Sequence, residues 1–102
     1  MRIKIFKGKS RMGFPEYTVV GKNIYIGSNT LGFPDYNISR NKIYKGSSTL
    51  SPAEYTISNN KIFKGDTALG VPEYTISDGK IYKGRVAAGF PEYTIVEESD
   101  TQ

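Results

Sequence analysis

Five acidic residues recur at one position of the chain at intervals of 19 residues: Glu16, Asp35, Glu54, Glu73 and Glu92. Acid–base catalysis needs two carboxyl groups whose surroundings make one a better acid than the other, whereas a repeat gives every copy nearly the same surroundings. One carboxylate per 19 residues also provides no dense set of oxygen ligands for a metal ion. We therefore expect solvated strand positions here, with no catalytic residue, metal site or cofactor.

Tyrosines and lysines recur at the same interval. The tyrosines are Tyr17, Tyr36, Tyr55, Tyr74 and Tyr93, and the lysines are Lys7, Lys45, Lys64 and Lys83. An aromatic ring beside an ammonium group can stack on a base of single-stranded nucleic acid or on a sugar. The same rings can instead pack in a core while their hydroxyls bond to backbone or water. If the protein has a ligand site, we expect it on this Tyr/Lys face.

The chain lacks the residue types that most other catalytic and metal-binding chemistry uses. It contains no Cys and no His, which excludes thiolate nucleophiles, imidazole bases and disulfides. A net charge of +4 and a pI near 9.3 suggest nucleic-acid binding. However, the acidic residue in every copy interrupts any basic stripe, and charges of both signs are typical of solvated strands and protected sheet edges.

The elements that must position these residues are β-hairpins. The period of 19 residues holds over five copies without insertion, and Ile5, Ile24, Ile43, Ile62 and Ile81 align. In the fourth copy, Glu73–Ser77 and Lys80–Lys83 flank Asp78-Gly79, a pair suited to a type I′ turn. The corresponding turns are Gly21-Lys22, Arg40-Asn41 and Asn59-Asn60, of which Arg40-Asn41 fits least well.

A two-residue turn fixes the register of each hairpin. It places Ser77 opposite Lys80, Ile76 opposite Ile81, Thr75 opposite Tyr82 and Tyr74 opposite Lys83, so that Tyr74, Ile76 and Ile81 share one face. The connectors between hairpins carry further apolar residues, which we expect to form a shared hydrophobic hub. These residues are Met12, Leu31, Leu50, Leu69 and Ala88, followed by Phe14, Phe33, Val71 and Phe90.

The ends of the chain predict how the array is closed. Arg2–Lys7 and Glu92–Val96 are the unpaired halves of a fifth hairpin, and pairing them removes two exposed sheet edges. We therefore predict an all-β, closed, propeller-like ring of five hairpin repeats in a single domain over 1–98, with a frayed tail at 99–102. The repeats run at about 4–22, 23–41, 42–60, 61–79 and 80–98.

The repeat also resembles a known family. Five copies of Gly-x-Pro-Glu-Tyr-Thr-Ile-x-x-x-Lys-Ile-Tyr-Lys-Gly over nearly the whole chain are similar to small bacterial proteins described as five-fold β-flowers. That resemblance implies short hairpins arranged about an axis, and it brings no established activity and no functional residues. A second resemblance, to MORN-type hairpin repeats that stack into an open sheet, matches the period and the glycine pattern less well.

For function, the sequence favours a non-enzymatic binding or scaffold module that presents repeated hairpin surfaces to a protein or glycan partner. The alternative is a nucleic-acid-binding protein that uses the basic Tyr/Lys face. No signal peptide or apolar span is evident, so we expect a cytoplasmic protein without a membrane partner.

Overall fold

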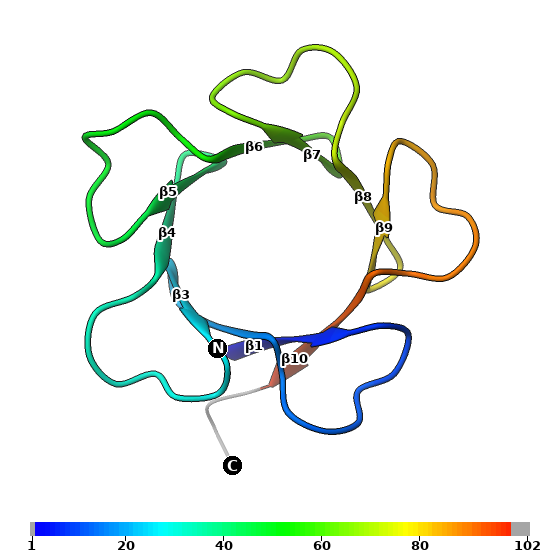
Figure 1. Ribbon diagram of the computed structural model, residues 1–102, viewed down its shortest axis with the longest axis horizontal. Helices are drawn as coiled ribbons and strands as arrows, with labels where there is room; N and C mark the ends of the chain where they lie inside the picture. Colours follow the sequence, from blue (N-terminus) through cyan, green and yellow to red (C-terminus); the bar gives the residue numbers. More distant parts are fainter. Residues whose placement is uncertain (1, 99–102) are drawn as a thin grey trace.

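The computed structural model describes residues 2–98, which form a closed ring of ten antiparallel strands and no helix (Figure 1). The strands are β1 (Arg2–Lys7), β2 (Tyr17–Val20), β3 (Asn23–Ile26), β4 (Tyr36–Ser39), β5 (Lys42–Lys45), β6 (Tyr55–Ser58), β7 (Lys61–Lys64), β8 (Tyr74–Ser77), β9 (Lys80–Lys83) and β10 (Tyr93–Glu98). This architecture confirms the predicted all-β ring of five hairpins. The tail expected at 99–102 lies outside the described residues.

The hairpin turns owe their shape to residues that accept positive φ angles. Both central residues are left-handed in the Arg40-Asn41 turn, with φ of 52° and 64°, although an arginine is an uncommon residue in that region. In the first turn Gly21 alone has a positive φ, of 62°, which suits a type II′ turn with glycine at its first central position. Two-residue turns therefore set the register of these hairpins, including the one whose residues fit least well.

The observed register confirms the predicted pairs. In the β8–β9 hairpin, Tyr74 faces Lys83, Thr75 faces Tyr82, Ile76 faces Ile81 and Ser77 faces Lys80. Four of the five junctions between neighbouring hairpins are shorter ladders, and β1 pairs with β2 over four residues. For example, β7 and β8 share only the pairs Lys61 with Thr75 and Ile62 with Tyr74.

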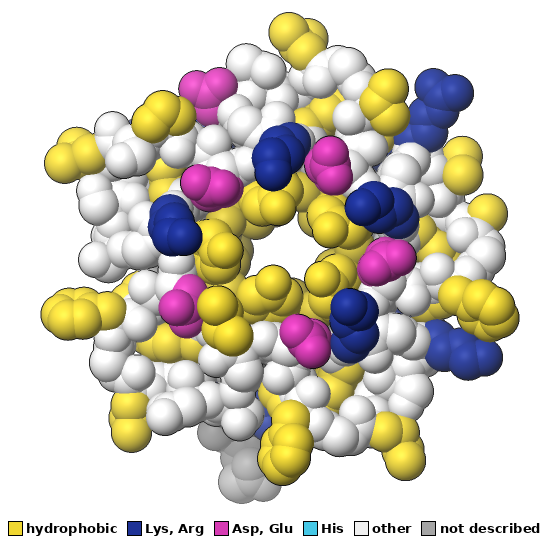
Figure 2. Space-filling view, viewed as in Figure 1, with side chains coloured by type: hydrophobic (Ala, Val, Ile, Leu, Met, Phe, Trp, Pro, Cys, Tyr) yellow, Lys and Arg dark blue, Asp and Glu magenta, His cyan; other side chains and the backbone are white. Residues whose placement is uncertain are grey.

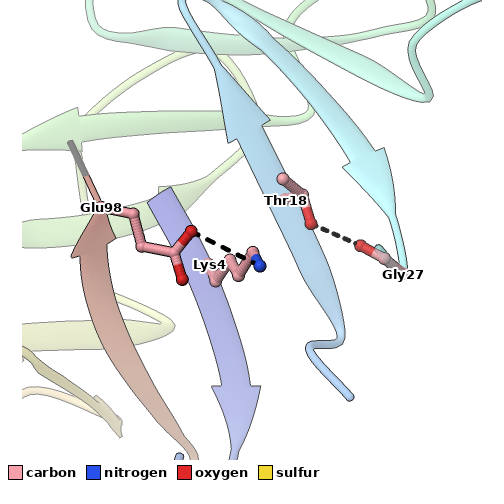
Figure 3. A network of polar contacts seen from close by, with 4 residues as sticks. All are labelled: Lys4, Thr18, Gly27 and Glu98. Carbon is pink, nitrogen blue, oxygen red and sulfur yellow. Dashed lines mark hydrogen bonds and ion pairs between the residues drawn. The ribbon is translucent and has the colours of Figure 1, made fainter. Parts of the chain in front are cut away.

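The ring is closed by the two ends of the chain. Six residue pairs join β1 to β10, from Arg2 opposite Glu98 to Lys7 opposite Tyr93. The expected partner segment ended at Val96, and the strand continues to Glu98, whose carboxylate lies 3.5 Å from the Lys4 ammonium (Figure 3). Both side chains are partly exposed, so this ion pair adds little to stability. The backbone ladder is what holds the seam.

Five connectors leave the ring and extend outward from it (Figure 1). We call them petals 1 to 5, in chain order: residues 8–16, 27–35, 46–54, 65–73 and 84–92. The predicted hydrophobic hub is wrong, because the side chains assigned to it lie on these petals. Leu50 is 95% exposed and Phe33 is 90% exposed. The hairpins themselves form the centre of the molecule.

The buried residues lie on both faces of the ring, with Ile24 and Ile81 toward the axis and a row of threonines on the outer face. Thr75 is buried and alternates along β8 with Tyr74, so the two side chains lie on opposite faces of the sheet. Its hydroxyl donates a hydrogen bond of 2.8 Å to the carbonyl oxygen of Gly84, at the start of petal 5. Thr18 makes the same bond to Gly27 at 2.7 Å (Figure 3), and Asn37 replaces threonine in the second copy, where its amide donates to Gly46 and Ser48. The base of each petal is tied to the ring in this way.

Lysines in three strands add a second tie between neighbouring hairpins. The Lys61 ammonium donates to the Thr75 hydroxyl at 3.3 Å and to the carbonyl oxygen of Arg85 at 2.7 Å. Lys42 makes the equivalent contacts with Thr56 and with the carbonyl of Asp66. Each lysine therefore links its own strand to the next hairpin and to the petal beyond it.

The part of the chain that is described contains no helix long and apolar enough to cross a membrane.

The closure makes a direct prediction about the first strand. Deleting residues 1–8 removes β1, including the buried Phe6, and leaves β2 and β10 without partners on that side. We expect the truncated chain to lose its cooperative unfolding transition in a denaturant titration followed by circular dichroism, whereas the exposed substitution Lys7→Ser should leave the midpoint unchanged. A truncated chain that unfolds at the midpoint of the full protein would rule out a ring that depends on its closure.

The buried threonine provides a second prediction. Thr75→Val leaves the Gly84 carbonyl and the Lys61 ammonium without this partner, at a cost of about 1–3 kcal/mol in the free energy of unfolding. Thr75→Asn should cost much less, since Asn37 already fills the equivalent position in the second copy. Urea titrations of both variants measure the difference, and equal losses would show that the hydrogen bonds are unimportant.

Candidate ligand-binding site on the ring axis

The candidate site is a cavity on the axis of the ring. Its volume is about 170 Å³, and it is lined by one isoleucine and one tyrosine from each copy. The lining residues are Ile5, Ile24, Ile43, Ile62 and Ile81 with Tyr17, Tyr36, Tyr55, Tyr74 and Tyr93. Figure 2 shows that the disc is open at its centre, with hydrophobic side chains around the opening. We call this cavity the axial channel.

The strand period and the register together explain the channel. Tyr74 faces Lys83 within its own hairpin and Ile62 on the preceding hairpin, so the tyrosine of one hairpin lies beside the isoleucine of the hairpin before it. Because alternate residues of a strand share a face, closing the ring directs all these side chains toward the axis. The channel is thus a product of closure and belongs to no single copy.

The tyrosine rings pack against one another at the channel. The centroids of the Tyr17 and Tyr93 rings are 6.3 Å apart at an interplanar angle of 60°, and Tyr74 and Tyr93 are 6.3 Å apart at 65°. These are edge-to-face contacts, an arrangement that aromatic pairs favour over face-to-face stacking. These contacts favour defined orientations for three of the five rings that line the channel.

Charged side chains of both signs surround the channel opening seen in Figure 2. The ammonium groups of Lys64 and Lys83 each lie 5.8 Å from the centroid of the tyrosine ring opposite them, Tyr55 and Tyr74 respectively, which is cation–π range. The remaining two lysines of the predicted set, Lys7 and Lys45, face Tyr93 and Tyr36 in the ladder.

One copy departs from this arrangement. Ile26 faces Tyr17 where the other copies have lysine, and 59% of its surface is exposed. Its backbone N–H donates a 2.8 Å hydrogen bond to the carboxylate of Asp35, the last residue of petal 2. The rim of the channel therefore has one apolar sector among four basic ones.

Burial raises the pKa of Tyr17, Tyr55 and Tyr74 above the ordinary value for a phenol. The pKa of Tyr93 rises to about 12, because burial is reinforced by the negative charge that the neighbouring Tyr17 and Tyr74 would carry on ionisation. The Lys64 ammonium opposes the rise at Tyr55. These four phenols remain neutral at physiological pH, so each can both donate and accept a hydrogen bond.

The structure brings the predicted tyrosines and lysines together on one face of the sheet. The sequence did not identify the five isoleucines as part of the same cavity, because a hairpin register shows which side chains share a face but not where five such faces meet. Combining that register with the closure of the ring could have located them. In the part of the chain that the structure describes, no group of three or more acidic residues is placed to hold a metal ion.

Comparison with known proteins gives the family. A family model described as a 6-fold beta flower protein matches residues 2–95. The chain belongs to the beta-flower family. The predicted family type is therefore confirmed, although the matching model is named for six repeats and this beta-flower closes with ten strands, or five hairpins. No curated protein and no solved structure matches the chain.

The neutral tyrosines predict a loss of stability at alkaline pH. A phenol whose pKa is raised on folding binds its proton more tightly in the folded state, so its contribution is fully present below the unfolded pKa near 10 and is lost as pH rises through the folded value. For this beta-flower the loss should fall between about pH 10 and the Tyr93 pKa of about 12.

Denaturant titrations across that range, with ultraviolet absorbance to follow phenolate formation, measure this loss. Tyr93→Phe should flatten the dependence, because it removes the phenol that titrates last. A stability profile that is the same for the variant and the wild type would contradict the assignment.

Proposed function

We propose that this beta-flower is a non-enzymatic binding module that holds one ligand at the mouth of the axial channel. The observation that supports the proposal is that one tyrosine and one isoleucine from each copy line the same open cavity. A concave, mainly apolar site with a few polar groups at its edge is the usual form of a ligand pocket. The five copies thus build one shared site, in place of the five separate hairpin surfaces that the sequence suggested.

The chemistry of the site fits a glycan best, and a protein segment second. A sugar ring presents apolar C–H faces, which suit tyrosine rings and an isoleucine wall, together with hydroxyls that both donate and accept hydrogen bonds. The rim supplies both partners, since phenols and carboxylates accept while phenols and ammonium groups donate. A protein segment would use the same wall through an apolar side chain.

The equivalence of the copies supports binding over catalysis. Each of the five copies offers the channel the same two side chains, so no residue among them is set apart as an acid, a base or a nucleophile. The one departure at the rim, Ile26, is chemically inert. Repetition of this kind supplies a uniform surface, which suits recognition of a ligand better than turnover of a substrate.

Nucleic acid is the second candidate, and one observation favours it. Lys64 and Lys83 lie over tyrosine rings, as in platforms that stack bases and attract phosphates. Against it, an acidic residue immediately precedes every channel tyrosine, which places a negative charge beside each basic group. Phosphates passing over the mouth would meet repulsion as often as attraction.

The experiment compares a glycan array with mixed single-stranded DNA at two salt concentrations. We expect glycan binding that changes little with salt and that falls about tenfold to a hundredfold in Tyr55→Ala, because the wall is lost at that point. Tyr55→Phe, which keeps the ring, should retain most of the affinity, and Tyr44→Phe on the opposite face of the sheet serves as the control.

DNA binding whose logarithm falls steeply with the logarithm of salt, and which disappears in Lys45→Ala/Lys64→Ala/Lys83→Ala, would establish the nucleic-acid alternative. Turnover of any substrate would contradict both candidates.

A further inference from the structure

The petals carry nine large apolar side chains that are 62–95% exposed: Met12, Phe14, Leu31, Phe33, Leu50, Leu69, Val71, Val86 and Phe90. An exposed apolar side chain is ordinary when it stands alone, but repeated clusters at loop tips mark a contact surface. These side chains take no part in the ring or in the axial channel. They therefore need an explanation of their own.

In petals 1, 2 and 3, a hydrogen bond within the loop orders the backbone that carries these side chains. The Ser10 hydroxyl accepts a bond of 3.1 Å from the backbone N–H of Met12, and the side-chain Oδ1 of Asn29 accepts one of 2.9 Å from the backbone N–H of Leu31. Between Met12 and Phe14, Gly13 has a φ of 82°, a turn that lets both side chains leave the backbone at the tip. The apolar groups are thus presented by structured loops.

Charge distinguishes petals 1 and 5 from the other petals. Residues 9–15 contain Lys9 and Arg11, residues 85–91 contain Arg85, and neither segment contains an acidic residue. The corresponding segments of petals 2 and 3 contain no charged residue, and that of petal 4 contains only Asp66. Basic charge and exposed apolar groups coincide in two petals alone.

Those two petals are neighbours in space. Petal 5 ends at β10, petal 1 begins at β1, and these strands pair at the seam of the ring. The Lys9 ammonium of petal 1 lies 4.8 Å from the centroid of the Phe90 ring of petal 5. We call the edge of the disc made by petals 1 and 5 the seam edge; these two petals carry Met12, Phe14, Val86 and Phe90 and the three basic residues Lys9, Arg11 and Arg85.

The shape of the molecule favours a flat partner at this edge. The disc measures 40 × 36 × 20 Å, and its petals extend outward around the ring (Figure 1). A flat surface that meets such a disc on its edge touches two neighbouring petals, and the seam edge is the one at which both petals combine apolar tips with positive charge. Apolar groups that enter the acyl boundary while cations meet anionic headgroups are the recognised means of peripheral membrane binding.

We propose that the seam edge docks the protein on the surface of an anionic lipid bilayer. Phe14 and Phe90 enter the headgroup region, while Lys9, Arg11 and Arg85 contact anionic headgroups. This proposal is independent of the ligand at the axial channel, whose mouth remains free in an edge-on orientation. It departs from the expectation of no membrane partner, which relied on the lack of a long apolar run. Apolar side chains at loop tips can enter the headgroup region without a long apolar run in the sequence.

Cosedimentation with vesicles tests the proposal. We expect the full chain to bind vesicles of phosphatidylcholine mixed with phosphatidylserine and to bind pure phosphatidylcholine much more weakly. Arg11→Gln/Arg85→Gln should weaken binding to the mixed vesicles by roughly fivefold for each cation removed. Phe14→Ser/Phe90→Ser should weaken it by about tenfold or more, since two apolar groups leave the bilayer.

The repeat provides a matched control in Phe33→Ser/Val71→Ser, which makes the same change at the equivalent positions of petals 2 and 4. This variant should bind as the wild type does, and circular dichroism should show that all variants keep the fold, because the substituted apolar side chains are at least 70% exposed and both arginines are exposed. The proposal is overturned if the full chain fails to bind mixed vesicles, if it binds neutral vesicles equally well, or if the control loses as much as Phe14→Ser/Phe90→Ser. Self-association through the petals in sedimentation, without vesicle binding, would also overturn it.

Discussion

The pairing of β1 with β10 is the constraint on which the rest of the structure depends. Hairpins of four-residue strands are at best marginal in water, and each gains stability only from its neighbours on both sides. With the ends joined, every strand has two partners and no edge is left open. The same closure directs the tyrosines and isoleucines to a common axis, so that the candidate site exists only in the closed ring. The stability of the fold and the geometry of the candidate site therefore depend on the same ladder.

Much of this fold could be predicted from the sequence because its strongest signals are local and repeated. Asp78-Gly79 between two alternating segments specifies a hairpin and its register, and the 19-residue period extends that result to the other copies. Closure followed from counting strands, since Arg2–Lys7 and the last strand had no other partner. The pairing of tyrosine with lysine on one face came from the same register. Its meaning as a ligand site is still a prediction.

The direction of the connectors could not be predicted in this way. Apolar residues such as Phe33 and Leu50 suggested a hub, because burial is the usual fate of large apolar side chains. The ring leaves no place for them inside, since its axis is already lined by its own tyrosines and isoleucines. Its outer face is sealed by threonines whose hydroxyls bond to the petal bases. Local pattern shows that a residue is apolar, but only the closed ring, with its axis already lined, shows that the residue must face outward.

Ile26 gives the ring an orientation that the repeat alone lacks. A ligand on an axis of identical sectors could settle in five equivalent rotations, and this degeneracy favours binding by the logarithm of their number, about 1 kcal/mol. The same degeneracy leaves the rotation of the ligand about the axis undefined. The apolar sector beside Tyr17 makes one rotation different from the others. A ligand that prefers this rotation loses the statistical gain and binds in a single pose. Isoleucine at position 26 would thereby give a bound ligand one preferred rotation about the axis of the ring.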